Sequence, residues 1–225
     1  MDRRYYEAYD ERYKQIHREK LLWFSEMPSP IVAQVMERFG VTPSDRILEL
    51  GCGEGRDAQY LLKKGYDVLA TDVSPAAIAC CRALDPAHEG KYQVLDCVKG
   101  KLDGKYRFIY AVAVVHMLVE DADRDGFYRF IREHLTRDGI ALICTMGDGT
   151  FERRTDPRTA FELQERLHEQ SGKTLCITGT SCRMVSFHTL EAELTRNDLM
   201  LRERGITAVE PDFPELMYAV VTGMD

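Results

Sequence analysis

The chain has 225 residues, of which 44% are hydrophobic and 30% charged, and its formal net charge is -7. An acidic chain lacks the concentrated positive face that nucleic-acid binding needs, and no run approaches the roughly 20 apolar residues of a membrane span. These features predict a globular protein with neither nucleic acid nor membrane as its partner.

Cysteine usage indicates the compartment. Seven cysteines occur, an odd number, and no CxxC pair is present. Buried free thiols in a reducing compartment fit this pattern better than a disulfide framework, and we expect no metal site. The N-terminus has no apolar segment of a secretory signal, so the sequence favours a cytoplasmic location.

Residues 1–28 are rich in tyrosine and charge. Tyr5, Tyr9 and Tyr13 recur at the spacing of one helix face. We expect a helical cap, either an amphipathic helix that packs onto the body or, as the alternative, an aromatic flap over a site. A second helix is expected from Ser29, an N-cap followed by proline, to Gly40.

Short apolar runs then alternate with helical patterns. The expected strands are residues 47–50, 67–71, 92–95, 108–115 and 140–145. The expected helices are residues 57–64, 75–83 and 122–135. Alternation of this kind predicts βαβ units and a parallel sheet covered on both faces.

The pattern changes after residue 145. Residues 147–186 are polar and read as a lid inserted into a single domain that spans residues 1–225. The segments expected from there on are a helix near 158–170, strand-like pieces at 174–178 and 183–187, a helix at 189–195, and strands at 200–209 and 216–222. The last two strands, joined by a proline-rich turn, predict an antiparallel pair at the sheet edge.

The stretch ILELGCGEGR, residues 47–56, predicts a ligand site. Gly51 and Gly53 follow a strand and precede a helix, where glycine lets the backbone turn sharply and approach a ligand. Arg56 stands where a dinucleotide fingerprint needs glycine, and Glu49 would repel phosphate but attract an ammonium group. The loop therefore suits an amino-acid moiety.

Two further carboxylates end the next strands. Asp72 could accept both hydroxyls of a ribose, and Asp96, in VLDC, could accept from the exocyclic amine of adenine. Aspartates at strand ends are also common as caps or turn formers. Together with Glu49, however, they describe a crevice for a nucleoside with a positively charged amino-acid tail.

The successive motifs ILELGCGEG, ATDVSPAAI, VLDC, IYAVAVVHML and RDGIALI, within residues 30–145, resemble those of class I S-adenosylmethionine-dependent methyltransferases. The resemblance implies an α/β fold, a Rossmann-like, doubly wound seven-stranded sheet that is mostly parallel with the last strand antiparallel. It also implies S-adenosyl-L-methionine as methyl donor and S-adenosyl-L-homocysteine as product. The expected reaction is in-line transfer of the methyl group to a small-molecule acceptor, by a monomer or homodimer.

The resemblance also assigns residues to the donor. These are Glu49, Gly51, Cys52, Gly53, Asp72, Val73, Asp96, Cys97, Ala111 and Ala113. It places the glycines and the two alanines along the methionine part, Asp72 at the ribose, and Val73, Asp96 and Cys97 around the adenine.

Residues on the acceptor side are expected from the segments that follow. His116, after the fourth strand, could act as a general base if the acceptor arrives protonated, or could instead hold structure or stack on the donor. Tyr9, Asp148, Arg153 and Arg183 are substrate candidates; Asp148 equally fits a turn, and the arginines equally fit solvated surface.

Other functions stay open from the sequence. A dinucleotide-dependent oxidoreductase disagrees with Arg56 and Glu49, and an aminopropyl transferase usually carries an acidic pair after the fourth strand that AVAVVHM lacks. A non-catalytic cofactor-binding protein is the third alternative. Whether an oxygen, nitrogen, sulfur or metalloid atom accepts the methyl group is also open.

Overall fold

The computed structural model of the chain describes residues 4–23, 27–168 and 170–224. The parts of the expected cap at residues 1–3 and 24–26, and residue 169 of the expected helix, lie outside the described residues. Within the described residues, no helix is both long enough and apolar enough to cross a membrane.

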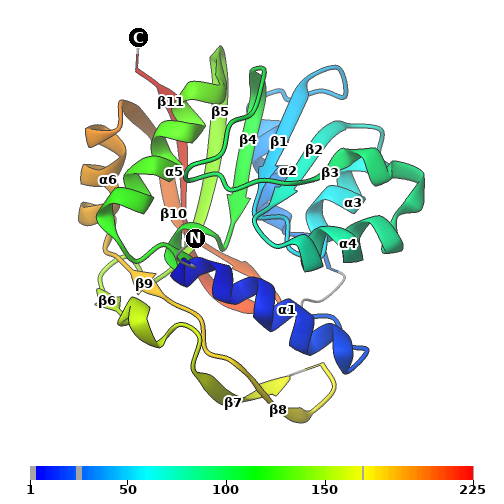
Figure 1. The fold of residues 1–225 in the computed structure, drawn as a ribbon. Coiled ribbons are helices and arrows are strands. Elements are labelled where there is room, and N and C mark those ends of the chain that lie inside the picture. The colour runs from blue at the N-terminus through cyan, green and yellow to red at the C-terminus, as the bar shows by residue number, and fades with distance from the viewer. Residues whose placement is uncertain (1–3, 24–26, 169, 225) are drawn as a thin grey trace.

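A seven-stranded sheet forms the centre of the molecule, in the order β10-β11-β5-β4-β1-β2-β3 (Figure 1). Its strands are β1 (Arg46–Leu50), β2 (Asp67–Asp72), β3 (Tyr92–Val94), β4 (Tyr106–Val112), β5 (Leu135–Met146), β10 (Leu199–Val209) and β11 (Phe213–Gly223). The five strands β3, β2, β1, β4 and β5, in their order across the sheet, pair in parallel with their neighbours. Strand β11 is antiparallel to both β5 and β10. The predicted fold class is confirmed, and the predicted antiparallel pair, β10 and β11, lies at one edge of the sheet, with β10 outermost.

Helices cover both faces of the sheet. On one face lie α2 (Pro30–Arg38), α3 (Arg56–Lys63) and α4 (Pro75–Leu84), and on the other lie α5 (Asp121–His134) and α6 (Phe187–Arg196). Strand residues alternate between the two cores, so that Ile47 packs with α2 and α3 while Leu48 packs with α5. Strands buried on both faces read as continuous apolar runs, which explains why the sequence locates them well.

A buried ion pair joins the two helices of the second face. Arg124 of α5 donates to both carboxylate oxygens of Glu193 of α6, at 2.7 and 2.6 Å, and neither side chain is accessible to more than a trace of solvent. Arg124 also donates to the carbonyl oxygen of Val115, at 2.8 Å. The pair therefore fixes the segment that follows β4, which borders the pocket described below.

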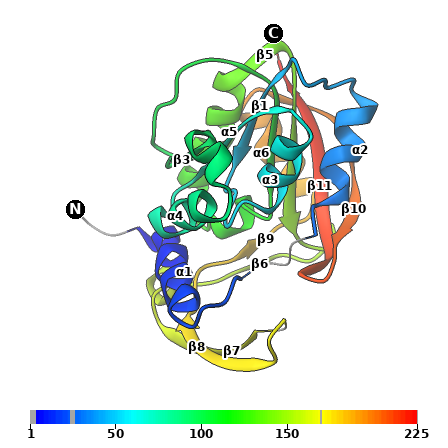
Figure 2. The same cartoon turned by 90° about the vertical axis from the view of Figure 1, so that its right-hand side faces the viewer.

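The N-terminal segment and the insert lie at one end of the sheet. The short helix Tyr5–Glu7 and α1 (Ala8–Arg18) lie below the carboxyl end of β4, and the hairpin of β7 (Leu163–His168) and β8 (Lys173–Thr178) lies beyond α1 (Figures 1 and 2). Arg12 ties the two together by donating to the carbonyl oxygens of residues 178 and 179, at 2.9 and 2.6 Å. The insert is completed by β6 (Arg153–Arg154), paired with β9 (Arg183–Met184).

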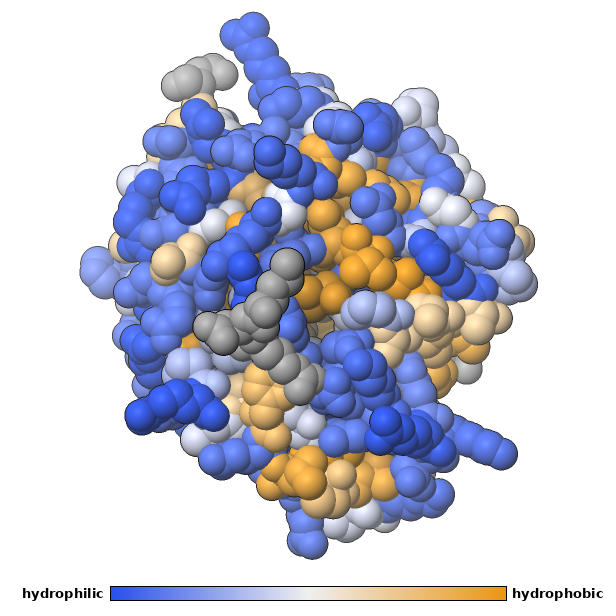
Figure 3. All heavy atoms as spheres, viewed as in Figure 1, coloured by the Kyte–Doolittle hydropathy of each residue, from blue (hydrophilic) through white to orange (hydrophobic). Residues whose placement is uncertain are grey.

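The prediction of a helix at residues 158–170 is wrong. Leu163 and Leu167, four residues apart, resemble one helix face, but both project outward from strand β7 and are 61% and 60% exposed. Pairing with β8, which carries threonine and isoleucine, outweighs that local preference. In Figure 3, apolar side chains are visible at the lower edge of the molecule, where the hairpin of β7 and β8 lies in the same view of Figure 1. A larger apolar area lies near the centre, and most of the remaining surface in this view is hydrophilic.

Four strand boundaries also differ from the prediction. The fourth strand ends at Val112, not at residue 115, because Ala113 takes a left-handed conformation with φ of 57° and Val115–Met117 forms a 3-10 turn. The strand expected at 183–187 stops at Met184, since Ser186 caps α6 by accepting from the backbone N–H of Thr189. The strand expected at 140–145 begins earlier, at Leu135, and the strand expected at 216–222 begins at Phe213. The remaining expected elements agree with the structure to within two residues.

Candidate functional site

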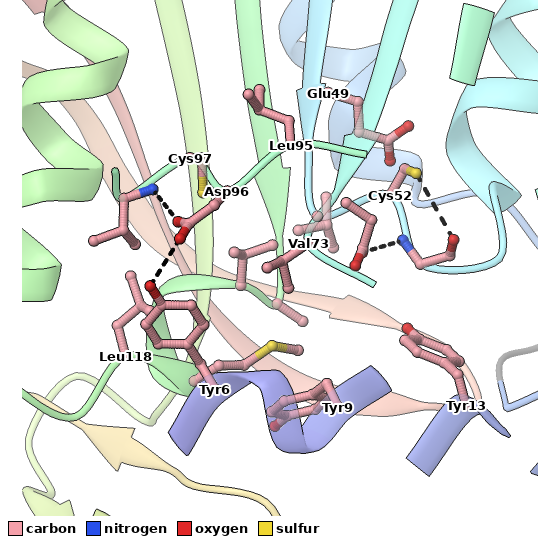
Figure 4. Close-up of a pocket in the computed structure, with 18 of the residues that line it drawn as sticks. Tyr6, Tyr9, Tyr13, Glu49, Cys52, Val73, Leu95, Asp96, Cys97 and Leu118 are labelled. Carbon is pink, nitrogen blue, oxygen red and sulfur yellow. Dashed lines mark hydrogen bonds between the residues drawn. The ribbon is translucent and has the colours of Figure 1, made fainter. Parts of the chain in front are cut away.

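A pocket opens at the carboxyl ends of β1, β2, β3 and β4, between the sheet and α1. It contains about 880 Å³ of empty space, open solvent at the mouth included. The residues that line it are Tyr6, Tyr9, Tyr13, Glu49, Gly51, Cys52, Gly53, Arg56, Asp57, Asp72, Val73, Leu95, Asp96, Cys97, Val98, Val112, Ala113, Val114, Met117, Leu118 and Phe213. Figure 4 shows the strand-end residues on one side and the tyrosines on the other.

The glycine loop forms the wall next to β1. Gly51 has a φ of +72°, and its N–H donates to the carbonyl oxygen of Thr71 at 2.7 Å. A Cβ atom at Gly51 would lie 2.4 Å from Cγ2 of Val114. Only glycine therefore lets this turn lie so close to the segment after β4.

Glu49 places an unpaired carboxylate oxygen in the pocket wall. Its side chain is 3% exposed, and Oε2 has no hydrogen-bond partner among the described residues. Burial raises the pKa of Glu49 well above its usual value, and the nearby Asp57 carboxylate raises it further. A buried acceptor of this kind is stabilised by a positively charged donor, so the pocket suits a ligand with an ammonium group.

Asp72 ends β2 and braces the loop. Its Oδ2 accepts from the N–H of Gly53 at 2.9 Å, and its Oδ1 accepts from the N–H of Ser74 at 2.8 Å. Burial raises the pKa of Asp72 to about 6, although these two backbone hydrogen bonds oppose the shift. A carboxylate has about four lone-pair sites, so each oxygen keeps the capacity to accept from one ligand hydroxyl.

Asp96 lies at the far end of the pocket, past β3. Its Oδ1 accepts from the N–H of Val98 at 2.9 Å, and its Oδ2 accepts from the hydroxyl of Tyr6 at 3.0 Å (Figure 4). Val73 and Cys97 also line the pocket. The three carboxylates predicted at strand ends therefore border one pocket.

The N-terminal tyrosines face these carboxylates from the opposite side. Tyr9 and Tyr13 of α1 line the pocket as two members of the expected row, whereas Tyr5 turns away and donates to Asp123 at 2.8 Å. Tyr6 lines it instead, because the chain begins with a 3-10 turn before α1 starts at Ala8. The aromatic flap, which the sequence offered as the alternative, matches this placement.

Two residues predicted beside the donor or acceptor lie elsewhere. Ala113 lines the pocket, but Ala111 packs in the core beside α5. The two alanines would share a face in a continuous strand, but β4 ends at Val112 and Ala113 has a left-handed φ of 57°. His116 is 4% exposed and does not line the pocket, because the 3-10 turn directs Met117 and Leu118 inward in its place. Burial, aided by Arg124 and Arg12, lowers the pKa of His116 to about 3. His116 is buried outside the pocket lining in this structure.

Of the four substrate candidates, only Tyr9 lines the pocket; Asp148, Arg153 and Arg183 do not. Asp148 is exposed and accepts from the N–H groups of residues 150 and 151, both at 2.7 Å, which is the turn given as its alternative. Arg153 is exposed on β6. Arg183 donates to the carbonyl oxygen of Val119 and to Asp121, at 3.0 and 2.5 Å, so it holds structure instead of facing the pocket.

Several lining residues were not predicted from the sequence. They are Tyr6, Arg56, Asp57, Leu95, Val98, Val112, Val114, Met117, Leu118 and Phe213. Most are chain neighbours of predicted residues at strand ends, so extending each motif by a few positions would have found them. Phe213, at the start of β11, carries no local signal, since only the tertiary fold brings it to the pocket.

Comparisons with known proteins agree with this geometry. Residues 48–141 match a family model described as a methyltransferase domain. A malonyl-[acyl-carrier protein] O-methyltransferase of Bacillus cereus is 29% identical over 130 residues, which make up 56% of this chain and 47% of that protein. The chain spans about half the length of the curated relatives that it matches.

Solved structures share the whole fold. An S-adenosylmethionine-dependent methyltransferase from Clostridium acetobutylicum superposes with a TM-score of 0.67 at 13% identity, over 98% of this chain and 99% of that one. A glycopeptide N-methyltransferase in complex with (S)-adenosyl-L-methionine superposes with a TM-score of 0.64 at 20% identity, over 91% and 97%. The motifs, the family match over residues 48–141 and the seven-stranded sheet agree: the chain has the fold of class I S-adenosylmethionine-dependent methyltransferases and is similar in sequence to a methyltransferase domain over residues 48–141.

Proposed function

We propose that the chain binds S-adenosyl-L-methionine in this pocket and transfers its methyl group to a small-molecule acceptor. The observation that carries the proposal is the unpartnered, buried Oε2 of Glu49 beside the glycine loop. An ammonium group of the donor would satisfy that oxygen, the ribose hydroxyls would meet Asp72, and the adenine amine would meet Asp96. A dinucleotide would bring a pyrophosphate to this loop, and the acceptor-only oxygens of a pyrophosphate cannot donate to the unpartnered Oε2 of Glu49.

The chemistry asks little of the protein beyond alignment. The donor supplies an activated methyl group as part of a sulfonium. The glycine loop and the strand-end carboxylates orient the ligand, and Tyr6, Tyr9 and Tyr13 shield it from water. Holding nucleophile and methyl group in a near-attack geometry is the main contribution expected of the chain, and no dedicated base is assigned.

The acceptor is proposed to enter beside Tyr9, Met117 and Leu118, the aromatic and apolar part of the lining. The proposed organisation is one domain over residues 1–225, with a cap at about 1–28 and a lid at about 147–186. The named relatives act on an acyl-carrier-bound malonyl group and on a glycopeptide, so they favour no single acceptor atom.

Calorimetric titration and a transfer assay test the proposal. The chain should bind S-adenosyl-L-methionine and S-adenosyl-L-homocysteine, and should release S-adenosyl-L-homocysteine when a panel of small acceptors carrying O, N or S nucleophiles is added. The same assay with decarboxylated S-adenosyl-L-methionine as donor and polyamines as acceptors tests for aminopropyl transfer. Binding of NADH in place of both adenosyl ligands would refute the methyltransferase proposal, and binding without turnover of any acceptor would favour the non-catalytic alternative.

Donor affinity should fall as the pH is lowered through about 6. The pKa of Asp72 is raised to about 6 by burial, and the ribose hydroxyls are bound best by the ionised carboxylate, so protonation competes with binding. At pH 5, one unit below this pKa, about one carboxylate in ten is ionised. We therefore expect the affinity for S-adenosyl-L-homocysteine to fall roughly tenfold between pH 8 and pH 5. Calorimetry across this range on wild type and Asp72→Asn measures it; a variant with an equally steep decline would assign the titration to another group.

Removing the hydroxyl of Tyr6 should weaken donor binding modestly. The hydroxyl donates to Oδ2 of Asp96 at 3.0 Å and so holds both the flap and the carboxylate in place. We expect Tyr6→Phe to bind S-adenosyl-L-homocysteine roughly 3- to 10-fold more weakly, the effect of about one hydrogen bond. Tyr66→Phe, at a tyrosine outside the lining, serves as control. If Tyr6→Phe and Tyr66→Phe bind S-adenosyl-L-homocysteine with equal affinity, the Tyr6 hydroxyl does not contribute to donor binding.

A further inference from the structure

Three potential metal ligands meet behind the glycine loop, outside the pocket lining. They are His17 of α1, Glu54 of the glycine loop and Cys80 of α4, and their ligand atoms all lie within 4.8 Å of one another. His17 Nε2 lies 2.8 Å from Oε1 of Glu54. Glu54 is buried, while His17 and Cys80 are half-buried, so an ion could reach the group from solvent.

The donor set selects one class of metal. Imidazole nitrogen, thiolate sulfur and carboxylate oxygen are the ligands of zinc-class divalent cations, whereas magnesium and calcium favour sites made of oxygen alone. Three protein ligands leave a fourth position for water. The carboxylate is already oriented, since Oε2 of Glu54 accepts from the backbone N–H of Trp23 at 2.8 Å, the kind of outer contact that metal sites use.

We propose that His17, Glu54 and Cys80 bind one zinc-class cation that fastens α1 over the pocket. The three ligands come from three elements: the helix that carries Tyr9 and Tyr13, the loop that carries Gly53, and the helix that follows Asp72. A bound cation joins flap and loop by coordinate bonds, where the structure now has a hydrogen-bonded pair. The fastening role rests on the proposed function, but the metal site does not.

Cobalt spectroscopy on the metal-free full chain, without any adenosyl ligand, tests the site. Addition of Co²⁺ should produce a thiolate-to-cobalt charge-transfer band that saturates at one equivalent and disappears when Zn²⁺ displaces the cobalt. Trp23 is the only tryptophan of the chain, and its emission should change at the same equivalence point because its backbone N–H donates to Oε2 of Glu54.

Variants assign the ligands. Cys80→Ser should abolish the band, and His17→Gln should weaken cobalt binding at least tenfold. Cys176→Ser, at an exposed cysteine on β8, should leave both the band and the affinity unchanged. Absence of a saturable band in the wild type, or a band that survives Cys80→Ser, would overturn the metal site whether or not the chain binds the donor.

The fastening role has its own readout. If the cation holds α1 closed, one equivalent of Zn²⁺ should slow the dissociation of S-adenosyl-L-homocysteine about tenfold in wild type and leave it unchanged in Cys80→Ser. An equal dissociation rate with and without Zn²⁺, in a chain that shows the cobalt band, would overturn the fastening while leaving the site in place.

Discussion

Asp72→Ala should bind S-adenosyl-L-methionine and S-adenosyl-L-homocysteine at least 100-fold more weakly than wild type in calorimetric titration. The carboxylate is proposed to accept from two ribose hydroxyls, and each hydrogen bond to a charged group contributes about 1.5–3 kcal/mol. The same side chain holds the N–H of Gly53 at 2.9 Å, so its removal also loosens the loop that lies along the methionine part. Both effects act in the same direction.

Two further variants separate charge from position. Asp72→Asn keeps the shape and one carbonyl acceptor, and should lose about tenfold, intermediate between wild type and Asp72→Ala. Asp138→Ala removes a carboxylate that is 79% exposed and far from the pocket lining, and should bind as wild type does. Wild-type affinity of Asp72→Ala would exclude Asp72 from the site.

Asp72→Asn should bind the donor more weakly than wild type without being less stable toward unfolding. Because burial raises the pKa of Asp72 in the folded chain to about 6, the folded state binds its proton more tightly than the unfolded state does. The ionised side chain therefore costs stability above pH 6, and this cost disappears as the pH falls below the unfolded value near 3.9. At pH 8 the free energy of unfolding of Asp72→Asn, measured with urea, should be no lower than that of wild type. A lower value would mean that the hydrogen bonds from Gly53 and Ser74 outweigh the desolvation cost.

The donor side of the pocket could be predicted from local sequence because local sequence builds it. Glu49, Asp72 and Asp96 sit at the ends of parallel strands, and such ends meet at one edge of a sheet whatever the rest of the chain does. The glycine loop is equally local, since its conformation depends on residues that lack a Cβ. The structure places all of these residues around one pocket, as expected.

The proposed acceptor side of the pocket depends on contacts that the sequence does not show. His116 follows β4 closely, yet one 3-10 turn directs it into the core and brings Met117 and Leu118 to the pocket. The helix predicted near residues 158–170 is replaced by a hairpin, because β7 pairs with β8. Phe213 reaches the pocket from the far end of the chain. Strand pairing outweighs the local pattern in the hairpin, and only the tertiary fold brings Phe213 to the pocket.

Gly51→Ala should lower the free energy of unfolding by about 3 kcal/mol or more and abolish measurable donor binding. A φ of +72° costs an alanine about 1 kcal/mol or more. The new Cβ would also lie 2.4 Å from Cγ2 of Val114, so the loop or the segment after β4 must move, and overpacking of this kind costs a further 1–3 kcal/mol. Movement of either one changes the wall against which the donor is proposed to lie.

A matched glycine isolates the steric part of this effect. Gly40 has a similar φ of +65°, and a Cβ there would meet no atom within 4 Å, so Gly40→Ala should lose only the conformational part and keep donor binding. Val114→Ala removes both Cγ atoms that a Cβ at Gly51 would strike, and the remaining Cβ would be 3.4 Å away. The double variant Gly51→Ala/Val114→Ala should therefore regain stability relative to the sum of the single variants in urea titrations. Strict additivity would show that the contact with Val114 is not the reason that position 51 requires glycine, and would leave the backbone conformation as the only cause.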